Sequence, residues 1–266
     1  MIKINGKIIE QGRFPDGTLL IKEDIPAAFR GEKSAVITWK YENDSETAAL
    51  YYLTKHLRSQ GFKDIHLDMP YIPNARQDRV KTPEDVFTLK YFAELINSLG
   101  FTSVTVLDPH SSVSEALIDR IVINTPQKYI KDVIEAINSD KLIMFYPDEG
   151  AMKRYSAMSP MPYAFGIKKR DWATGKIIGL DAAGETECIK GSSILIVDDI
   201  CSRGGTFYHS AKKLKELGAK KIYLFITHCE NTILKGELIT SGLIEKIYTT
   251  NSIFTAEHEK IEVIDI

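Results

Sequence analysis

Cysteine is scarce in this chain, where only Cys188, Cys201 and Cys229 occur among 266 residues. Their spacing matches none of the usual metal-ligand patterns, and three thiols are too few for a disulfide scaffold. Because nothing in this pattern requires an oxidising compartment, a reducing cytoplasm is the default expectation.

Long apolar runs and a strong charge of one sign are also missing. The apolar runs fall far short of a membrane span, and the first residues, MIKINGKIIEQGRF, lack the apolar core of a signal peptide. The formal net charge is only −2, which gives no general attraction to nucleic acid or an anionic membrane. With 44% hydrophobic and 26% charged residues, we expect a soluble globular protein with neither as a partner.

What the chain does contain is a regular alternation of strand and helix patterns. Thr206–Leu217 has an apolar stripe at helical spacing and is followed by Gly218, while Thr88–Leu99 has the same pattern before Gly100. Such alternation is typical of an α/β fold with parallel sheets covered by helices. The expected strands are Ile65–Tyr71, Val104–Leu107, Leu142–Tyr146, Ile194–Val197 and Ile222–Ile226.

A weak internal echo suggests two similar halves. In each, a helix ends at Leu-Gly and a strand follows, so that Gly100 precedes His110 by the same ten residues that separate Gly218 from His228. We interpret this as two α/β domains, 1–128 and 129–251. The alternative is that any helix–glycine–strand unit would look the same.

Residues 194–207, ILIVDDICSRGGTF, contain the first chemical signal. Asp198 and Asp199 stand at the carboxyl end of an expected parallel strand, where ligands of open sheets bind. Their carboxylates can accept hydrogen bonds from vicinal ribose hydroxyls or face a metal. The glycines after them free backbone N–H groups to surround an anion at a helix start. An ordinary strand–turn–helix connection is the alternative. The expected anion loop comprises Ser202, Arg203, Gly204, Gly205 and Thr206.

This stretch resembles the phosphoribosyl-pyrophosphate (PRPP) motif of the type I phosphoribosyltransferase superfamily. Two positions depart from that motif. Ser202 stands where the motif is often acidic, and Arg203 stands where it is usually small or polar. Neither change removes the anion loop, and Arg203 adds a positive charge. The motif implies a ribose phosphate ligand but does not separate an enzyme that makes PRPP from one that uses it.

Residues 69–80, MPYIPNARQDRV, place two arginines, an amide and a carboxylate together after an expected strand. An arginine can stack on a base or bind phosphate, and Gln77 and Asp78 can bind a purine edge. A solvated charged loop is the alternative from chemistry alone. The segment is similar to the loop of ribose-phosphate diphosphokinases (PRPP synthetases) that lines their ATP site. Further segments resemble this family in its own order: RFPDGTLLIKED (13–24), VTVLDPHSS (104–112), FYPDEGAMKRY (145–155), YAFGIKKRD (163–171) and IYTTNSI (247–253).

The resemblance implies a fold of two similar phosphoribosyltransferase-like domains, each a mostly parallel sheet flanked by helices. It also implies roles for individual residues. Lys168 and Arg170 match the catalytic Lys-x-Arg pair, and they begin a segment suited to a mobile lid, KKRDWATGKIIG. His110 and Asp148 mark the Mg²⁺-associated positions. Asp198, Asp199 and Ser202–Thr206 would hold ribose 5-phosphate. The ATP side would comprise Phe14, Asp16, Gly17, Thr18 (where the family commonly has Glu), Arg76, Gln77 and Asp78.

Taken singly, several of these residues have simpler explanations. Asp148 could cap a helix that starts near Ala151, His110 could be a packed residue, and 168–170 could be a solvated basic loop. His228 lies opposite His110 in the internal echo, which suggests a place on the adenine side of the site. The roles become convincing because the segments occur together and in order.

The implied reaction transfers the β,γ-diphosphoryl group of ATP to the C1 hydroxyl of ribose 5-phosphate, with Mg²⁺ as cofactor. No GxxxxGK[ST] or GxGxxG motif is present, so ATP would be bound in this family's own manner. A PRPP-using phosphoribosyltransferase and a non-catalytic associated subunit are the alternatives. The resemblance also implies a homo-oligomer, at least a dimer and by analogy a hexamer, and it places residues 252–266 back on the N-terminal domain.

Overall fold

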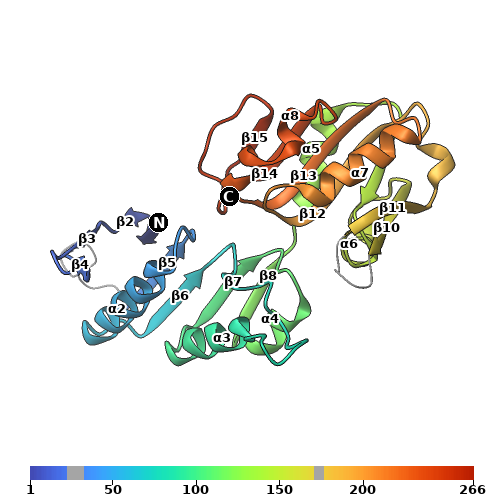
Figure 1. Ribbon diagram of the computed structural model, residues 1–266. Coiled ribbons are helices and arrows are strands. Elements are labelled where there is room, and N and C mark those ends of the chain that lie inside the picture. Colours follow the sequence, from blue (N-terminus) through green and yellow to red (C-terminus); the bar gives the residue numbers. More distant parts are fainter. Residues whose placement is uncertain (23–32, 171–176) are drawn as a thin grey trace. The chain divides into compact units, whose positions relative to one another are not determined.

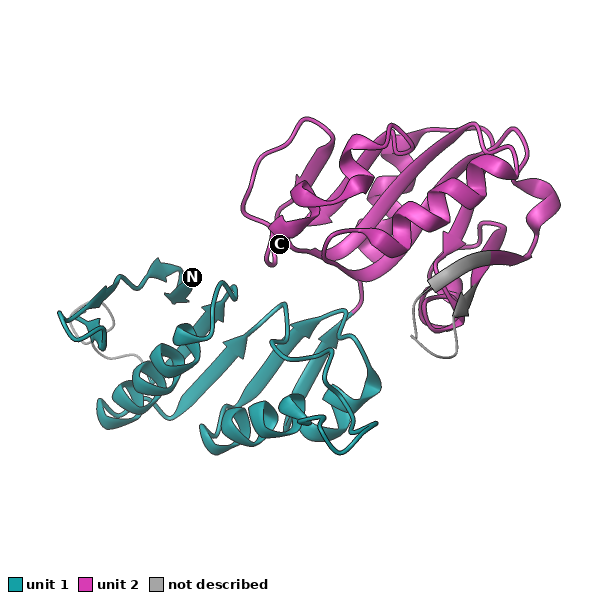
Figure 2. Ribbon diagram, in the orientation of Figure 1, with its two compact units in different colours: residues 1–124 teal, residues 125–266 magenta. Residues whose placement is uncertain are grey.

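The computed structural model describes residues 1–22, 33–170 and 177–266, with the backbone alone at 168–170 and 177–180. The chain divides into two compact units, Met1–Asn124 and Thr125–Ile266 (Figure 2). The division falls slightly before the boundary expected at residue 128. Within the described ranges, no helix combines the length and apolar character needed to cross a membrane.

Unit 1 is built on a six-stranded sheet in the order β2-β1-β5-β6-β7-β8 (Figure 1). The strands β5 to β8 run parallel, and β1 joins β5 in the antiparallel direction. A separate hairpin is formed by β3 (Gln11–Arg13) and β4 (Leu19–Ile21). The sheet strands are β1 (Ile2–Ile4), β2 (Lys7–Ile8), β5 (Ser34–Trp39), β6 (Asp64–Asp68), β7 (Ser103–Leu107) and β8 (Ile121–Asn124); the helices are α2 (Ser45–Ser59), α3 (Thr88–Ser98) and α4 (Ser112–Leu117).

The core of unit 1 forms where α2 and α3 pack on the sheet. Leu50 of α2 and Phe92 of α3 join alternate strand residues such as Ile37 and Leu67 in one buried cluster. Val36, which lies between inward-facing neighbours on β5, is 42% exposed. This period-two pattern explains why the strands of unit 1 are only half apolar in sequence.

Unit 2 contains a seven-stranded sheet in the order β11-β10-β9-β12-β13-β14-β15 (Figure 1). All neighbours are parallel except β10 and β11. The strands are β9 (Leu142–Tyr146), β10 (Tyr163–Arg170), β11 (Ile177–Gly184), β12 (Ser193–Cys201), β13 (Lys221–Cys229), β14 (Lys246–Thr250) and β15 (Ile261–Ile264). The helices are α5 (Gln127–Ile137), α6 (Glu149–Tyr155), α7 (Gly205–Glu216) and α8 (Glu237–Thr240), with 3-10 turns η1 (Ser156–Met158), η2 (Thr186–Cys188) and η3 (Asn231–Lys235).

Helices cover both faces of the unit 2 sheet. Ile194 and Ile196 belong to the core cluster that includes α7 and α8, while Leu195 and Val197 belong to the cluster that includes α5 and α6. Because successive residues of β12 are buried on opposite faces, the strand reads as a continuous aliphatic run. The predicted fold, two mostly parallel sheets flanked by helices, is confirmed.

Three details differ from the sequence-based expectations. The strands β12 and β13 continue past the apolar runs, because their pairing extends to Cys201 and Cys229; Asp198 and Asp199 therefore lie within β12 rather than after it. The segment 247–253, which the resemblance presents as the last strand, contains most of β14, and β15 follows it. Residues 252–266 belong to unit 2, where β15 pairs with β14, and this corrects the expectation that they return to the N-terminal domain.

Candidate active site

The aspartate pair lies near the carboxyl end of β12, beside an arginine that the sequence did not single out. Asp199 is almost completely buried, and its Oδ2 forms an ion pair of 3.1 Å with Nη1 of Arg154 on α6. The same guanidinium lies 5.5 Å from the ring centre of Tyr155. Arg154 therefore places a positive charge beside Asp199 at this end of the strand.

Asp198 has a different electrostatic environment. Burial raises the pKa of the Asp198 carboxyl well above its usual value, and the charges of Asp199 and Asp148 act in the same direction, although the residue keeps some accessible surface. The three carboxylates are thus close enough to repel one another. A ligand that brings hydroxyl donors or a cation would relieve this repulsion.

Asp148 serves as the N-cap of α6. Its Oδ1 accepts a hydrogen bond of 3.0 Å from the Ala151 backbone N–H. The capping explanation is therefore correct for this side chain. The cap is compatible with a role of Asp148 near a magnesium ion, because it uses one carboxylate oxygen and the charge of Asp148 also acts on Asp198.

The anion loop begins with a backbone conformation that favours glycine. Gly204 is the N-cap of α7 and has a φ of 78°, and a Cβ added there would lie 2.9 Å from the Leu238 side chain. Gly205 starts the helix, and a Cβ there would meet nothing within 4 Å. The loop is therefore shaped by packing at Gly204 and open at Gly205, where an anion could approach the backbone.

Gly236 supports this loop from outside the motif. A Cβ at position 236 would lie 1.9 Å from the carbonyl oxygen of Arg203, so the backbone of residue 236 packs directly against the loop. Gly236 has a φ of −93°, which any residue can adopt. Position 236 requires glycine because a side chain would collide with the loop, and not because of its backbone conformation. No local sequence pattern predicts this requirement.

Ser202, the first departure from the motif, is hydrogen-bonded to a carboxylate from another strand. Its Oγ donates to Oε1 of Glu230 at 2.9 Å, and Thr232 Oγ1 donates to Oε2 of the same side chain at 2.9 Å. The Glu230 backbone N–H also donates to the Cys201 carbonyl. The loop thus has an acidic group beside it although position 202 is serine. Arg203, the second departure, is exposed.

Arg154 provides a direct test of this arrangement. Substituting Arg154→Met keeps the stem and removes the charge beside buried Asp199. We expect the free energy of unfolding to fall by an amount between about 1 kcal/mol, as for exposed pairs, and about 3 kcal/mol, as for buried ones. Binding of ribose 5-phosphate should weaken as well. Urea denaturation and calorimetric titration measure the two effects, and Lys153→Met is the matched control because Lys153 pairs with exposed Glu149.

The predicted catalytic pair is located by its backbone alone. Lys168 and Arg170 lie on β10, opposite Leu180 and Ile177 of β11, with an irregularity in register between Lys169 and Arg170. Their side chains, and residues 171–176 of the predicted lid, lie outside the described residues.

In unit 1, the loop containing Arg76–Arg79 precedes α3. Arg76 and Gln77 are exposed, and Thr88 of α3 donates to Oε1 of Gln77 at 2.8 Å. Asp78 is buried and accepts two hydrogen bonds from its neighbour Arg79, of 2.7 and 2.9 Å. Asp78 therefore anchors the loop through its contact with Arg79, and Arg76 and Gln77 are exposed beside it.

The structure brings this loop close to the predicted metal-associated histidine. The Arg79 guanidinium lowers the pKa of Asp78 to about 2, and the Ser111 hydroxyl and the charge of His110 act in the same direction. His110 lies beyond the end of β7, three residues after Leu107. Two segments that are far apart in sequence, 76–79 and 110–111, thus lie within electrostatic range of each other in unit 1.

The N-terminal segment forms the tip of the β3–β4 hairpin. Phe14 is 49% exposed, and Gly17 has a φ of 85°. Thr18 donates from its hydroxyl and its backbone N–H to Oδ1 of Asp16, at 2.7 and 3.0 Å, and these bonds lower the pKa of Asp16. Thr18 therefore stabilises the turn, while Phe14 is the side chain that the tip exposes.

His228 does not mirror His110. It lies within β13, is 2% exposed, and its Nδ1 is 2.8 Å from Ser252 Oγ in a buried polar cluster with Thr250. His110 follows β7 and is only half-buried. The internal echo therefore reproduces helix, glycine and strand, with Gly100 and Gly218 both at positive φ, but not the environment of the histidine.

The carboxylates of unit 2 fit a magnesium ion that arrives with a nucleotide. Among the described residues, no group of three His, Cys, Asp or Glu side chains is placed to hold a metal by itself. Magnesium bound to a nucleotide takes most of its ligands from phosphate and water and needs only one or two carboxylates, such as Asp148 and Asp198. His110, a nitrogen ligand in unit 1, is a less suitable direct ligand for this ion.

The chain is similar in sequence and in fold to several known proteins. A family model described as "Phosphoribosyl synthetase-associated domain" matches residues 184–266. The ribose-phosphate pyrophosphokinase of Sulfolobus acidocaldarius is 29% identical over 276 residues, covering 100% of this chain and 89% of that protein. That of Saccharolobus solfataricus is 28% identical over 233 residues, covering 86% and 77%. A crystal structure of phosphoribosylpyrophosphate synthetase from Mycobacterium smegmatis superposes with a TM-score of 0.79 at 19% identity, covering 97% and 86% of the two chains.

Two mostly parallel α/β units, one of them with an aspartate pair and a glycine turn at a strand end, give this chain the same fold as that synthetase structure. The matches of 28–29% sequence identity along nearly the whole chain point to one group of proteins with this fold. Along nearly its whole length the chain is similar to ribose-phosphate pyrophosphokinases, also called PRPP synthetases.

Proposed function

We propose that this protein is a ribose-phosphate diphosphokinase, which transfers the β,γ-diphosphoryl group of ATP to the C1 hydroxyl of ribose 5-phosphate and forms PRPP and AMP. The observation that carries the proposal is that the Asp78 loop lies within electrostatic range of His110 in unit 1. A transferase that uses PRPP needs no ATP site. A diphosphokinase needs an ATP side, and these segments resemble the one that its family uses.

Each part of the chain has a task in this reaction. The backbone N–H groups at 204–206 bind the 5-phosphate, and Asp198 and Asp199 accept hydrogen bonds from the ribose hydroxyls. Arg76 and Gln77 bind ATP, and exposed Phe14 packs on adenine of a neighbouring copy. Lys168 and Arg170 stabilise the charge that develops on the transferred group. Asp148 and Asp198 would hold a magnesium ion together with the phosphates, and the ion would supply charge neutralisation.

A direct assay tests the proposal. The protein is incubated with ATP, Mg²⁺ and ribose 5-phosphate, and the expected products are AMP and PRPP in equal amounts. Formation of ADP in place of AMP would exclude diphosphoryl transfer. Base exchange on added PRPP without AMP formation would favour a phosphoribosyltransferase.

A non-catalytic associated subunit is the second candidate. The family model that matches 184–266 is named for a synthetase-associated domain, and Ser202 and Arg203 depart from the motif of the ribose phosphate site. This candidate predicts binding of ribose 5-phosphate with no turnover, and stimulation or inhibition of an active synthetase when the two are mixed. The retention of Lys168, Arg170, His110 and Asp148 supports the enzyme instead.

Arg76 separates ATP binding from ribose phosphate binding. Arg76→Gln should raise the KM for ATP by roughly 10-fold to 100-fold, the value of one hydrogen bond to a charged group. The KM for ribose 5-phosphate should change little, because the loop of 202–206 is in unit 2. Lys81→Gln is the matched control, since it removes one exposed charge from the same loop. Equal effects of both substitutions would indicate a general loss of positive charge and not a specific contact.

A further inference from the structure

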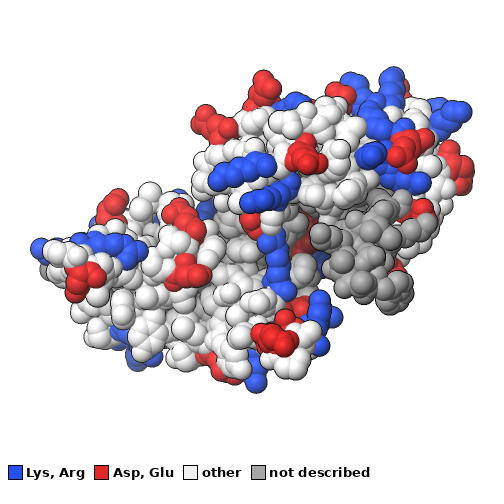
Figure 3. Space-filling view, in the orientation of Figure 1, with Lys and Arg blue, Asp and Glu red and all other residues white. Residues whose placement is uncertain are grey.

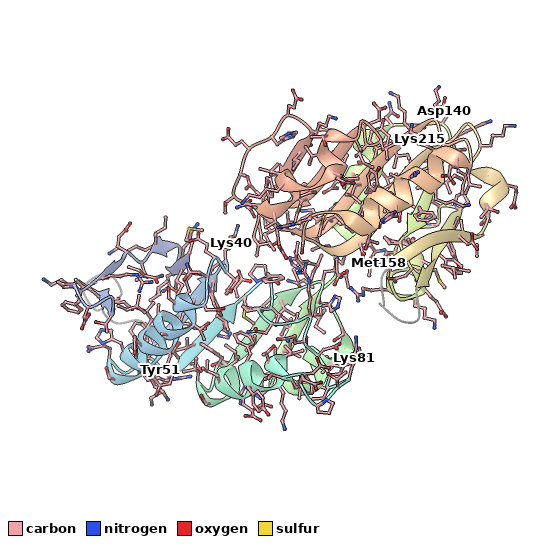
Figure 4. The ribbon with its side chains drawn as sticks, in the orientation of Figure 1. Lys40, Tyr51, Lys81, Asp140, Met158 and Lys215 are labelled. Carbon is pink, nitrogen blue, oxygen red and sulfur yellow. The ribbon has the colours of Figure 1, made fainter. Side chains whose placement is uncertain are left out.

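A second cavity in unit 2 lies at the other end of β12 from the aspartate pair. It has a volume of about 380 Å³ and is bordered by the loop that follows α5 and by the first residues of β12 and β13. Ser193, at the start of β12, lines it, whereas Asp198 and Asp199 are near the opposite end of the same strand. Figure 4 shows Asp140 and Lys215 at this end of unit 2 and Met158, which follows α6, at the other.

The cavity is positively charged. Lys141, Lys220 and Lys221 line it, against the single carboxylate of Asp140. Within residues 1–22, 33–170 and 177–266, none of these three lysines forms an ion pair. Lysine and arginine side chains gather over this end of unit 2, at the upper right of the space-filling view (Figure 3).

These lysines differ from the basic residues that stabilise the neighbouring helix end. Lys215, in the last turn of α7, donates to the Lys220 carbonyl at 2.9 Å, and Lys213 is 4.0 Å from Glu216. Such contacts at a helix C-terminus are a common structural use of lysine. Among the described residues, no carbonyl or carboxylate accepts a hydrogen bond from the ammonium group of Lys141, Lys220 or Lys221, so these three groups are available to a ligand.

The backbone around the cavity is fixed by the sheet. Ser193 N–H donates to the Lys141 carbonyl at 2.9 Å, and Lys220 N–H donates to the Ser192 carbonyl at 2.8 Å. Ser193 also pairs with Lys221 in the ladder between β12 and β13, and its Oγ accepts from Ser139 Oγ at 3.0 Å. The lysines therefore project from anchored backbone positions, which reduces the ordering that a ligand must impose.

The lining suits an anion larger than one phosphate. The volume is at the lower end of the range for small-molecule sites, about 300 to 1,000 Å³, and three ammonium groups can neutralise two or more charges. The hydroxyl of Ser139 and the amide of Asn138 can hydrogen-bond to phosphate or ribose oxygens, and Tyr223 presents a half-buried aromatic ring. We propose that this cavity binds a diphosphate-bearing small molecule, either a nucleoside diphosphate or inorganic diphosphate.

Binding stoichiometry tests this site independently of the reaction. ADP and inorganic diphosphate are titrated separately into the full chain by calorimetry, with wild-type protein and with Lys220→Gln/Lys221→Gln. We expect one class of sites to weaken roughly tenfold or more in the double variant, while any binding at the ATP side is retained. The matched control is Lys128→Gln/Lys131→Gln, which removes the same charge from exposed positions of α5. Tighter binding of ADP than of diphosphate would identify the nucleoside as part of the ligand.

Three results would overturn the proposal. Isotherms that coincide for wild type and the double variant would show that these lysines bind neither anion. A lower melting temperature of the double variant, with unchanged binding of both anions, would show that the two lysines only stabilise helix ends. A mobility shift of a single-stranded oligonucleotide that needs the two lysines, without ADP or diphosphate binding, would assign them to nucleic acid. If the AMP assay failed, the proposed function would fall and these readouts would still be interpretable.

Discussion

Replacing Lys168 with alanine is expected to reduce turnover by about 100-fold to 1,000-fold, the usual effect of removing one group that stabilises charge in a transition state. Binding of ATP should largely survive, because Arg76 and Gln77 belong to a separate loop. The reduction should therefore affect kcat and kcat/KM equally, which is the pattern for an interaction made only in the transition state.

Lys169→Ala is the matched control, since it makes the same change one residue further along β10. It should leave turnover within a few-fold of wild type. Rapid-quench measurement of AMP gives the rate of the chemical step, and equilibrium dialysis with labelled ATP gives binding. Near-normal turnover of Lys168→Ala, or equal losses in both variants, would contradict the catalytic assignment.

Replacing Gly236 with alanine is expected to damage the ribose phosphate site from outside it. The added Cβ would lie 1.9 Å from the Arg203 carbonyl oxygen, so residues 202–206 must move. A displacement of about 1 Å in a positioned group can lower the rate 100-fold, and overpacking usually costs about 1–3 kcal/mol of folding stability. We expect a higher KM for ribose 5-phosphate together with a lower midpoint in urea.

Gly205→Ala separates these two effects. Its Cβ would meet nothing within 4 Å, and alanine is the better helix former, so stability should be unchanged or slightly higher. If the 5-phosphate lies against the backbone at Gly205, the methyl group obstructs it and the KM for ribose 5-phosphate rises. An unchanged KM in Gly205→Ala would place the phosphate elsewhere, and an unchanged KM in Gly236→Ala would show that the loop tolerates the displacement.

Much of the fold follows from local sequence patterns. The run Leu142–Tyr146 was predicted as a strand and is β9, and the stripes after Thr88 and Thr206 are α3 and α7. These patterns are reliable because burial on a face selects apolar residues at the period of the element. The DD and GGT residues likewise predict a ligand-binding site at the end of a strand, because the groups that would bind the ligand lie close together around one turn.

Other features depend on contacts between distant residues, and the sequence contains no sign of them. Arg154 meets Asp199 across 45 positions of sequence, and Glu230 receives the hydroxyl of Ser202 across 28. In the sequence, neither Arg154 nor Glu230 stands out from the other charged residues. Their contacts arise because the strand order of the sheet places α6 and the end of β13 beside β12. The polar ends of β12 and β13 were not predicted as strand, because their ladder bonds do not require apolar side chains.

The sequence by itself indicated the resemblance to PRPP synthetases, the alternating architecture and the residues that resemble a diphosphokinase, because all of these depend on short segments whose chemistry is self-contained. Only the tertiary structure decided that Asp148 caps α6 and adds its charge to the aspartate pair, that Thr18 holds a turn, and that Gly236 supports the anion loop. It also showed that three lysines, which form no ion pair within the described part of the chain, lie around one cavity, because parallel pairing brings residues 141, 193 and 221 to the same end of the sheet.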